Sequence, residues 1–435
     1  MDETRVPHEE MRVVSRSLSA AGDGQIMRVV AMVDGLEKRG AVDRIIAPLR
    51  PRLAELRPSR PLRFTRLLFL PLDPLIVPAA RWRPGSATVP RTALESIALT
   101  VRAALGPVAA AVDAAIAGRS LEDGDIIGEA GRMLWPHAGA LLAGSPELAG
   151  WDGTGLPAAT AGDLSRAVGG VLLAAVSLRG LAAEAGAGMA LEPGPVQAAL
   201  AEAAASGGEA LAMAVAVLLA WLPEAAELLP RGCSVLGPDG PALMRLAAGQ
   251  AAEVLLGRLE AQGASDDMLA VSLDETGAEV SRVTTLLDAL DGAGPPERRR
   301  RLSAIRGRLE ESCRSRFAKG MENGVSAPLR TMGPSPAQEE LADMENAARG
   351  LRQLEGAARK LGGGQYYDGA LQDAVTAVRA SPADGALGLA DKIRLVEILA
   401  GSDEADALME ESAPAYDTNA VDSRLLSHAR SAAAA

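Results

Sequence analysis

Apolar side chains recur at intervals of three and four residues through the last third of the chain, in three successive stripes. Their members are Val280, Val283, Leu286, Leu287 and Leu290, then Leu302, Ile305, Leu309, Cys313 and Phe317, and then Leu341, Met344, Ala348, Leu351, Leu354, Ala358 and Leu361. An α-helix brings positions with this spacing onto one face. The pattern predicts three amphipathic helices that pack as a bundle or as successive hairpins.

The middle of the chain, residues 92–260, is rich in Ala, Leu and Val, and Gly or Pro interrupts it repeatedly. Because these two residues end helices, the pattern predicts antiparallel helical hairpins. The longest apolar run, Ala210 to Pro223, is shorter than the roughly 20 residues that cross a bilayer. We therefore expect this run to be a buried core helix, and we expect no membrane span.

Residues 48–91 depart from the helical pattern because they contain nine of the 27 prolines. Proline at this density excludes a long regular helix. Apolar residues such as Phe64, Leu68 and Leu75 are nevertheless too frequent for a disordered linker. We expect an ordered connector that lies against the helices, with one short helix at 62–69.

These patterns predict an all-α fold: a multi-helix bundle or an irregular helical-hairpin solenoid, with an extended Pro/Arg-rich connector near the N-terminus. We expect five divisions along the chain. They are N-terminal helices at 1–47, the connector at 48–91, an Ala/Leu-rich helical domain at 92–260, a C-terminal amphipathic helical bundle at 261–400, and an acidic, flexible tail at 401–435.

Composition supports the helical prediction and limits the function. Aromatic residues make up only 2% of the chain, and the net charge of −12 argues against a general binder of nucleic acid or anionic membranes. The excess of Arg over Lys, with abundant Ala and Gly, is typical of a GC-rich bacterial genome. Cys233 and Cys313 lack a CxxC spacing, and residues 1–10 lack an apolar signal core. We therefore expect free buried thiols and a cytoplasmic protein.

Catalytic motifs are absent from the sequence. The three histidines, His8, His137 and His428, are too few for a histidine-rich metal site, and no HExxH, phosphate-loop or nucleophile-elbow motif occurs. Gly362 to Gly364 has no preceding strand and no following lysine, so we interpret it as a helix stop. The sequence therefore predicts no catalytic residue, no metal ion and no cofactor.

The connector is the first candidate binding site. Residues 50–91 contain nine arginines against two acidic residues, and three of the ten aromatic side chains lie among them. Arginine beside an aromatic ring can hold a carboxylate through paired hydrogen bonds and cation–π contact. The candidate residues are Arg63, Arg66, Asp73, Trp82, Arg83 and Arg91. Under the alternative interpretation, the arginines bind acidic helices of the same chain.

A second basic segment begins at four consecutive arginines. Its candidate residues are Arg298, Arg299, Arg300, Arg301, Arg306 and Arg308. Cations in the first turn of a helix oppose its dipole, which indicates either a partner or pairing with acidic neighbours of the same chain.

Two functions follow from these segments. We expect a non-catalytic interaction or scaffold protein that binds an acidic protein or peptide through the connector. The alternative is a nucleic-acid-associated regulator that uses the arginine face of residues 298–319. An enzyme remains a third hypothesis, which a closed pocket formed by Arg63, Arg66, Asp73 and Arg83 would favour.

Overall fold

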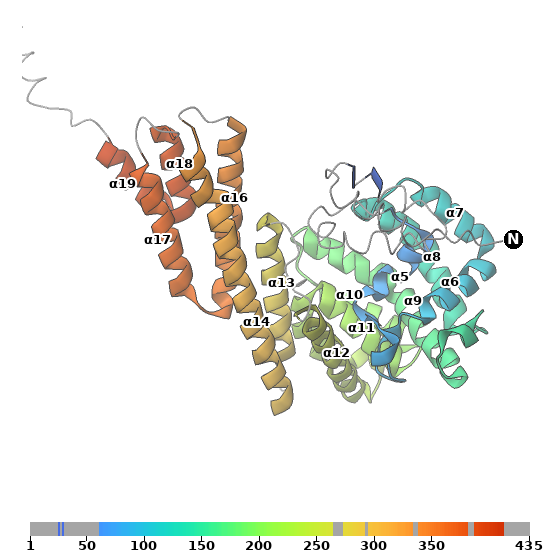
Figure 1. The fold of residues 1–435 in the computed structure, drawn as a ribbon. Helices are drawn as coiled ribbons and strands as arrows, with labels where there is room; N and C mark the ends of the chain where they lie inside the picture. Colours follow the sequence, from blue (N-terminus) through green and yellow to red (C-terminus); the bar gives the residue numbers. More distant parts are fainter. Residues whose placement is uncertain are drawn as a thin grey trace, which may run out of the picture. The chain divides into compact units, whose positions relative to one another are not determined.

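The computed structural model describes residues 61–263, 273–291, 295–333, 338–381 and 387–412, together with Gln25, Ile26, Arg28 and Val29 (Figure 1). Within these residues the protein is all-α, as the hydrophobic pattern predicts. Most of the predicted helices of 1–47, the start of the connector at 48–60 and the end of the tail at 413–435 lie outside the described residues.

The chain forms two compact units. Unit 1 comprises residues 1–270 and 285–305, and unit 2 comprises residues 271–284 and 306–435. The long helices α13 (Leu273–Asp291) and α14 (Pro296–Met321) therefore each contribute residues to both units.

The described part of the connector is a chain of short elements in unit 1. They are α5 (Phe64–Phe69), the 3-10 helix η2 (Leu70–Leu75), β1 (Ile76–Val77), the 3-10 helix η3 (Ala79–Arg81) and β2 (Val89–Pro90). The two strands are parallel, with Ile76 opposite Val89 and Val77 opposite Pro90. Proline inside η2 prevents α5 from continuing as a regular helix.

Apolar burial holds this connector in place. The side chains of Phe64, Leu67, Leu68, Leu72 and Leu75 are buried, and the segment contacts α8 (Gly124–Ala143), α9 (Ala161–Gly186) and α11 (Gly208–Trp221). The indole N–H of Trp135 donates a hydrogen bond of 2.9 Å to the Leu67 carbonyl. The connector is therefore part of the core of unit 1.

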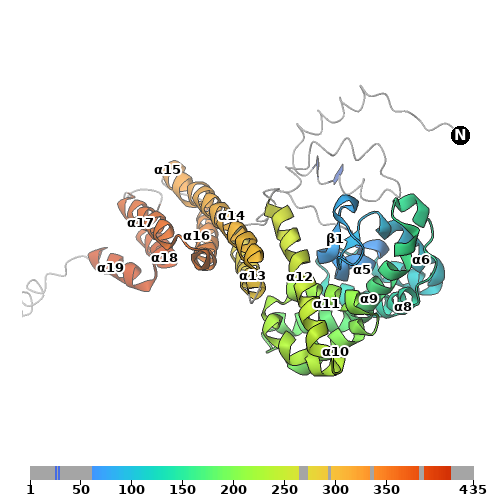
Figure 2. The ribbon, with the colours of Figure 1, turned by 90° about the horizontal axis from the view of Figure 1, so that it is seen from below.

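The remaining helices of unit 1 pack against one another, and α8, α9 and α11 are helices that contact several others (Figure 2). The helices are α6 (Ala93–Ala104), α7 (Gly106–Ile116), α8 (Gly124–Ala143), α9 (Ala161–Gly186), α10 (Pro193–Ala204), α11 (Gly208–Trp221) and α12 (Gly240–Gly263), with 3-10 segments at Trp151–Thr154, Ala158–Thr160 and Pro223–Leu236. Every residue of α11 from Ala210 to Ala220 is buried, so this run is the core helix that the sequence predicts.

Two glycines allow α8 and α9 to approach closely. A Cβ atom on Gly139 would lie 2.7 Å from the backbone nitrogen of Leu173, and one on Gly169 would lie 2.4 Å from that of Ala143. Such distances leave no room for a side chain, so the contact depends on glycine at both positions.

One segment within the described residues, Ala158–Gly186, has the length and apolar composition of a membrane span, and 56% of its most apolar window is buried inside the protein. The bent pair of α6 and α7 would add a second if counted as one span. Core helices of soluble proteins have the same properties, so these segments are weak evidence for a membrane protein.

Unit 2 contains the third of the C-terminal stripes whole and the other two in part. After α14 come a π-helical turn at Glu322–Ser326, then α15 (Ala327–Thr331), α16 (Gln338–Ala358), a 3-10 turn at Arg359–Leu361, α17 (Gly364–Ala380), α18 (Leu389–Ala400) and α19 (Ser402–Ser412). The stripe residues Leu309, Cys313 and Phe317 are fully buried, as are Ala348 and Leu351. The sequence pattern therefore identified most of the buried positions, although Leu341 and Leu361 are only half-buried.

The Gly362 to Gly364 turn separates α16 from α17. Gly362 and Gly363 have φ angles of +124° and +72°, and the Glu310 and Arg314 side chains pack against them. A side chain on Gly363 would collide with Arg314, so the glycines serve both the turn and the close approach of α14.

Candidate functional site

The structure separates the connector candidates into buried and exposed groups. Trp82 is buried, and its indole N–H donates to the Thr88 carbonyl at 3.0 Å. Arg66, Asp73, Arg83 and Arg91 are exposed, and Arg63 is half-buried at the start of α5. Trp82 therefore stabilises the loop that follows η3, while most of the charged candidate residues are exposed to solvent.

Three exposed arginines follow the short strands β1 and β2, and we call Arg81, Arg83 and Arg91 the connector arginine group. The backbone amides of Arg91 and Arg81 donate to the carbonyls of Val77 (2.8 Å) and Pro78 (2.9 Å). Because these acceptors are adjacent residues, whose Cα atoms lie about 3.8 Å apart, the backbones of the two arginines are close together. The Arg83 guanidinium donates to the Trp82 and Ala80 carbonyls at 2.6 and 3.1 Å.

The connector arginine group has no acidic side chain in contact among the described residues. Within the part of the chain that the structure describes, no ion pair joins Arg81, Arg83 or Arg91 to a carboxylate. The two carbonyl groups that accept hydrogen bonds from Arg83 are neutral, so they do not neutralise its positive charge. The group therefore presents three positive charges on a segment that core packing holds in place.

The second basic segment lies at the start of α14, and two of its arginines bind α12 of the same unit. Arg301 donates to Glu260 through Nε (2.7 Å) and Nη2 (3.0 Å), and to Glu253 through Nη1 (2.6 Å). Arg298 donates to Glu253 at 3.3 Å. These bonds, the one to Glu260 foremost, raise the pKa of Arg301 further above its usual range.

The other α14 candidates are distributed around the helix. Arg299, Arg300 and Arg308 are exposed and form no ion pair with any described residue, whereas Arg306 is half-buried. Arg300 and Arg301 are consecutive residues, about 100° apart around a helix, so their side chains leave it in different directions. The pairing with α12 is therefore specific to one side of α14.

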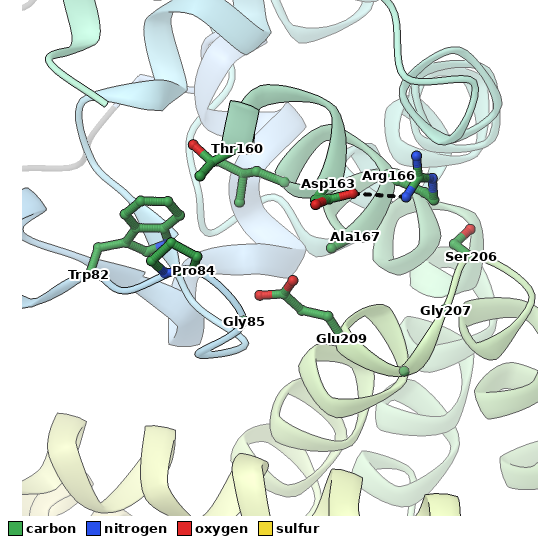
Figure 3. Close-up of a pocket in the computed structure, with 12 residues that line it drawn as sticks. Trp82, Pro84, Gly85, Thr160, Asp163, Arg166, Ala167, Ser206, Gly207 and Glu209 are labelled. Atoms are coloured by element: carbon green, nitrogen blue, oxygen red, sulfur yellow. Dashed lines mark hydrogen bonds and ion pairs between the residues drawn. The ribbon is translucent and has the colours of Figure 1, made fainter. Parts of the chain in front are cut away.

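A cavity of about 290 Å³ lies beside the connector loop in unit 1 (Figure 3). Three segments line it: the loop at Trp82 to Gly85, the start of α9, and the turn between α10 and α11. Its lining residues are Trp82, Pro84, Gly85, Thr160, Asp163, Leu164, Arg166, Ala167, Ser206, Gly207, Gly208 and Glu209. Of the sequence candidates it contains Trp82, but not Arg63, Arg66, Asp73 or Arg83.

Glu209 joins this cavity to the connector loop. The Ala87 amide donates to its Oε1 atom at 3.2 Å, and Ala87 itself has a φ angle of +53°. That left-handed conformation is strained for alanine, so the hydrogen bond stabilises a loop that would otherwise relax. Burial raises the pKa of the Glu209 carboxyl; the Ala87 hydrogen bond partly opposes this effect, and the nearby Asp163 carboxylate adds to it.

Sequence reasoning missed the Glu209 site because its parts are far apart along the chain. Glu209 and Ala87 are 122 residues apart. The local signal was Gly207-Gly208 directly before an acidic residue, which is also the pattern of an ordinary helix start. Only the folded chain shows that this helix start meets the Trp82 loop.

No other cluster with metal or redox chemistry stands out in the described ranges. They contain no group of three or more His, Cys, Asp or Glu side chains that could hold a metal ion. His137 is exposed, and its Nδ1 atom lies 3.0 Å from the Met133 carbonyl. Cys313 is a buried free thiol whose pKa is raised to about 12 by burial and by Glu310.

Comparisons of the chain with protein-family models, with curated protein sequences and with solved structures found no match.

Proposed function

We propose that this protein is a non-catalytic helical interaction protein that binds an acidic segment of a partner protein through the connector arginine group. The observation that carries the proposal is the exposure of Arg81, Arg83 and Arg91 without a carboxylate contact among the described residues. In a protein with 56 acidic residues, such a group keeps its hydrogen-bond donors available for an outside carboxylate.

The packing of the connector supports the same proposal. Trp82 and Val89 are buried beside these arginines, so the backbone that carries the charges is already ordered before a partner arrives. Pre-organised charges lose less conformational entropy on binding than charges on a flexible tail. An acidic peptide would therefore pair with the group at a lower entropic cost.

The experiment is a fluorescence-anisotropy titration with a labelled glutamate-rich peptide of about ten residues. Replacing Arg81 and Arg91 by alanine should weaken binding about 30-fold or more, because each charge-assisted hydrogen bond contributes roughly 1 kcal/mol or more. Arg132→Ala/Arg245→Ala is the matched control, since it removes two exposed arginines elsewhere in unit 1. Equal affinities for the two double variants would contradict the proposal.

A second candidate function rests on Arg299 and Arg300 at the start of α14. They are exposed and make no ion pair with described residues, so we also propose a nucleic-acid contact at this helix start as the alternative function. Two phosphate contacts would give a shallow salt dependence, with a slope of about −2 in log K against log salt. Binding of the acidic peptide together with no shift of a labelled DNA duplex at low salt would exclude this alternative.

A further inference from the structure

The cavity beside Trp82 contains a carboxylate that has no cationic partner among the described residues. Three charged residues line the cavity, and Arg166 pairs with Asp163 at 3.0 Å, where both side chains are well exposed. Glu209 forms no ion pair with a described residue. Its Oε1 atom accepts the Ala87 amide, which leaves Oε2 without a hydrogen-bond partner in the described structure.

The walls around Glu209 are aromatic and apolar. Trp82, Pro84, Leu164 and Ala167 line the cavity, and Figure 3 shows the Glu209 carboxylate directed into the space that they border. The hydrogen bond from the Trp82 indole to Thr88 fixes the plane of the ring. A carboxylate beside an aromatic ring is a combination that binds organic cations, through an ion pair and a cation–π contact.

The cavity has room for a small organic group. Its volume of about 290 Å³ far exceeds the roughly 30 Å³ that one water molecule occupies in the liquid, so an alkylammonium or alkylguanidinium group fits this space. The free Oε2 atom of Glu209 could accept a hydrogen bond from either cation, with the alkyl chain against Pro84 and Leu164.

We propose that this cavity binds a small organic cation, an alkylammonium or alkylguanidinium group, through the Glu209 carboxylate and the Trp82 ring. The proposal goes beyond the proposed function, because the connector arginine group selects a negative partner and the cavity a positive one. A free alkylamine or alkylguanidine carries such a cation, and so does a lysine or arginine side chain of a peptide.

A purely structural role for the acidic residues makes a different prediction. Asp163 and Glu209 lie in the first turns of α9 and α11, where carboxylates stabilise the helix dipole. If they did nothing else, Glu209→Gln would lower the melting temperature and no cation would bind to the wild-type protein.

The test is isothermal titration calorimetry of the full chain with n-butylammonium, n-butylguanidinium and the capped tripeptides Gly-Lys-Gly and Gly-Arg-Gly. We expect saturable binding with a dissociation constant of about 1 mM or lower, weakened at least tenfold by Glu209→Gln. Glu224→Gln is the matched control, because it removes an exposed carboxylate outside the cavity. Tighter binding of the tripeptides would identify a peptide side chain as the ligand, and tighter binding of the butyl ions a free amine.

A pH series on the wild-type protein gives a second readout that does not depend on the variant folding. Only ionised Glu209 attracts a cation, so affinity should be present above the raised pKa of this carboxyl and be lost as the pH falls through it. Asp163 and Arg166 are the other charged groups that line the cavity. Absence of saturable binding, affinity that does not change with pH, or an unchanged affinity in folded Glu209→Gln would each overturn the proposal.

Discussion

The connector and the start of α14 are both rich in arginine, yet their side chains have different surroundings. On α14, Arg298 and Arg301 bind Glu253 and Glu260 of the neighbouring helix α12. On the connector, Arg81 and Arg91 are exposed, and no ion pair with a described carboxylate involves them. A run of positive charge therefore indicates a binding surface only where the fold leaves that charge unpaired.

The same comparison explains why four arginines can begin a helix. Cations in the first turn of a helix are unfavourable by roughly a few tenths of a kcal/mol each. Arg301 offsets this cost because it contacts two carboxylates through three donors. We interpret Arg298 and Arg301 as residues that hold α14 against α12, and the connector arginine group as the partner surface.

The largest expected effect comes from reversing the connector charges. Arg81→Glu/Arg91→Glu should abolish binding of an acidic peptide, a loss of about 100-fold or more, because like charges replace the ion pairs. The melting temperature should stay within about 2 °C of the wild-type value, since exposed substitutions alter stability by less than about 0.5 kcal/mol. Anisotropy and differential scanning calorimetry measure the two quantities. A folded variant that still binds the peptide would contradict the claim that the connector, unlike the start of α14, is a binding surface.

A smaller effect is expected when the α14 pairing is removed. Arg301→Ala should lower the stability of unit 1 by about 1–2 kcal/mol, a moderate value because the paired side chains are partly exposed to solvent. The midpoint of urea denaturation, followed by circular dichroism, measures this change. Arg300→Ala is the neighbouring control and should have almost no effect. Equal midpoints for the two variants would show that the α12 contacts do not stabilise the fold.

The smallest effect is expected at the unpaired α14 arginines. Arg299→Ala/Arg300→Ala should raise stability by a few tenths of a kcal/mol, because it removes repulsion from the helix dipole and breaks no ion pair among the described residues. Thermal denaturation at low ionic strength is the most sensitive measurement, since salt screens the effect. A clear loss of stability would mean that these two side chains also hold α14 in place.

Much of the helical fold could be predicted from sequence, because helix periodicity is a local property. The stripe through Leu309, Cys313 and Phe317 is buried as expected, and the short connector helix predicted at 62–69 spans Phe64–Phe69. The paired strands β1 and β2 were not predicted. Two residues are too few for an alternating pattern to appear.

The candidate sites were less predictable because they depend on residues far apart in the chain. Arg301 and Glu260 are 41 residues apart, so their pairing appears only after α12 and α14 pack together. The sequence identified Trp82 and the connector arginines by composition, but it could not show that Trp82 turns inward while Arg81 and Arg91 remain outside. Glu209 carried no signal that distinguishes it from an ordinary helix start.

The most direct test of the account is the rate at which phenylglyoxal modifies each arginine of the native protein, read by peptide mass spectrometry. The account predicts fast modification of Arg81 and Arg91, slow modification of Arg301, and protection of Arg81 and Arg91 when an acidic peptide is bound. Fast modification of Arg301, or modification of Arg81 and Arg91 that the peptide leaves unchanged, would contradict the claim that the connector arginines form the partner surface.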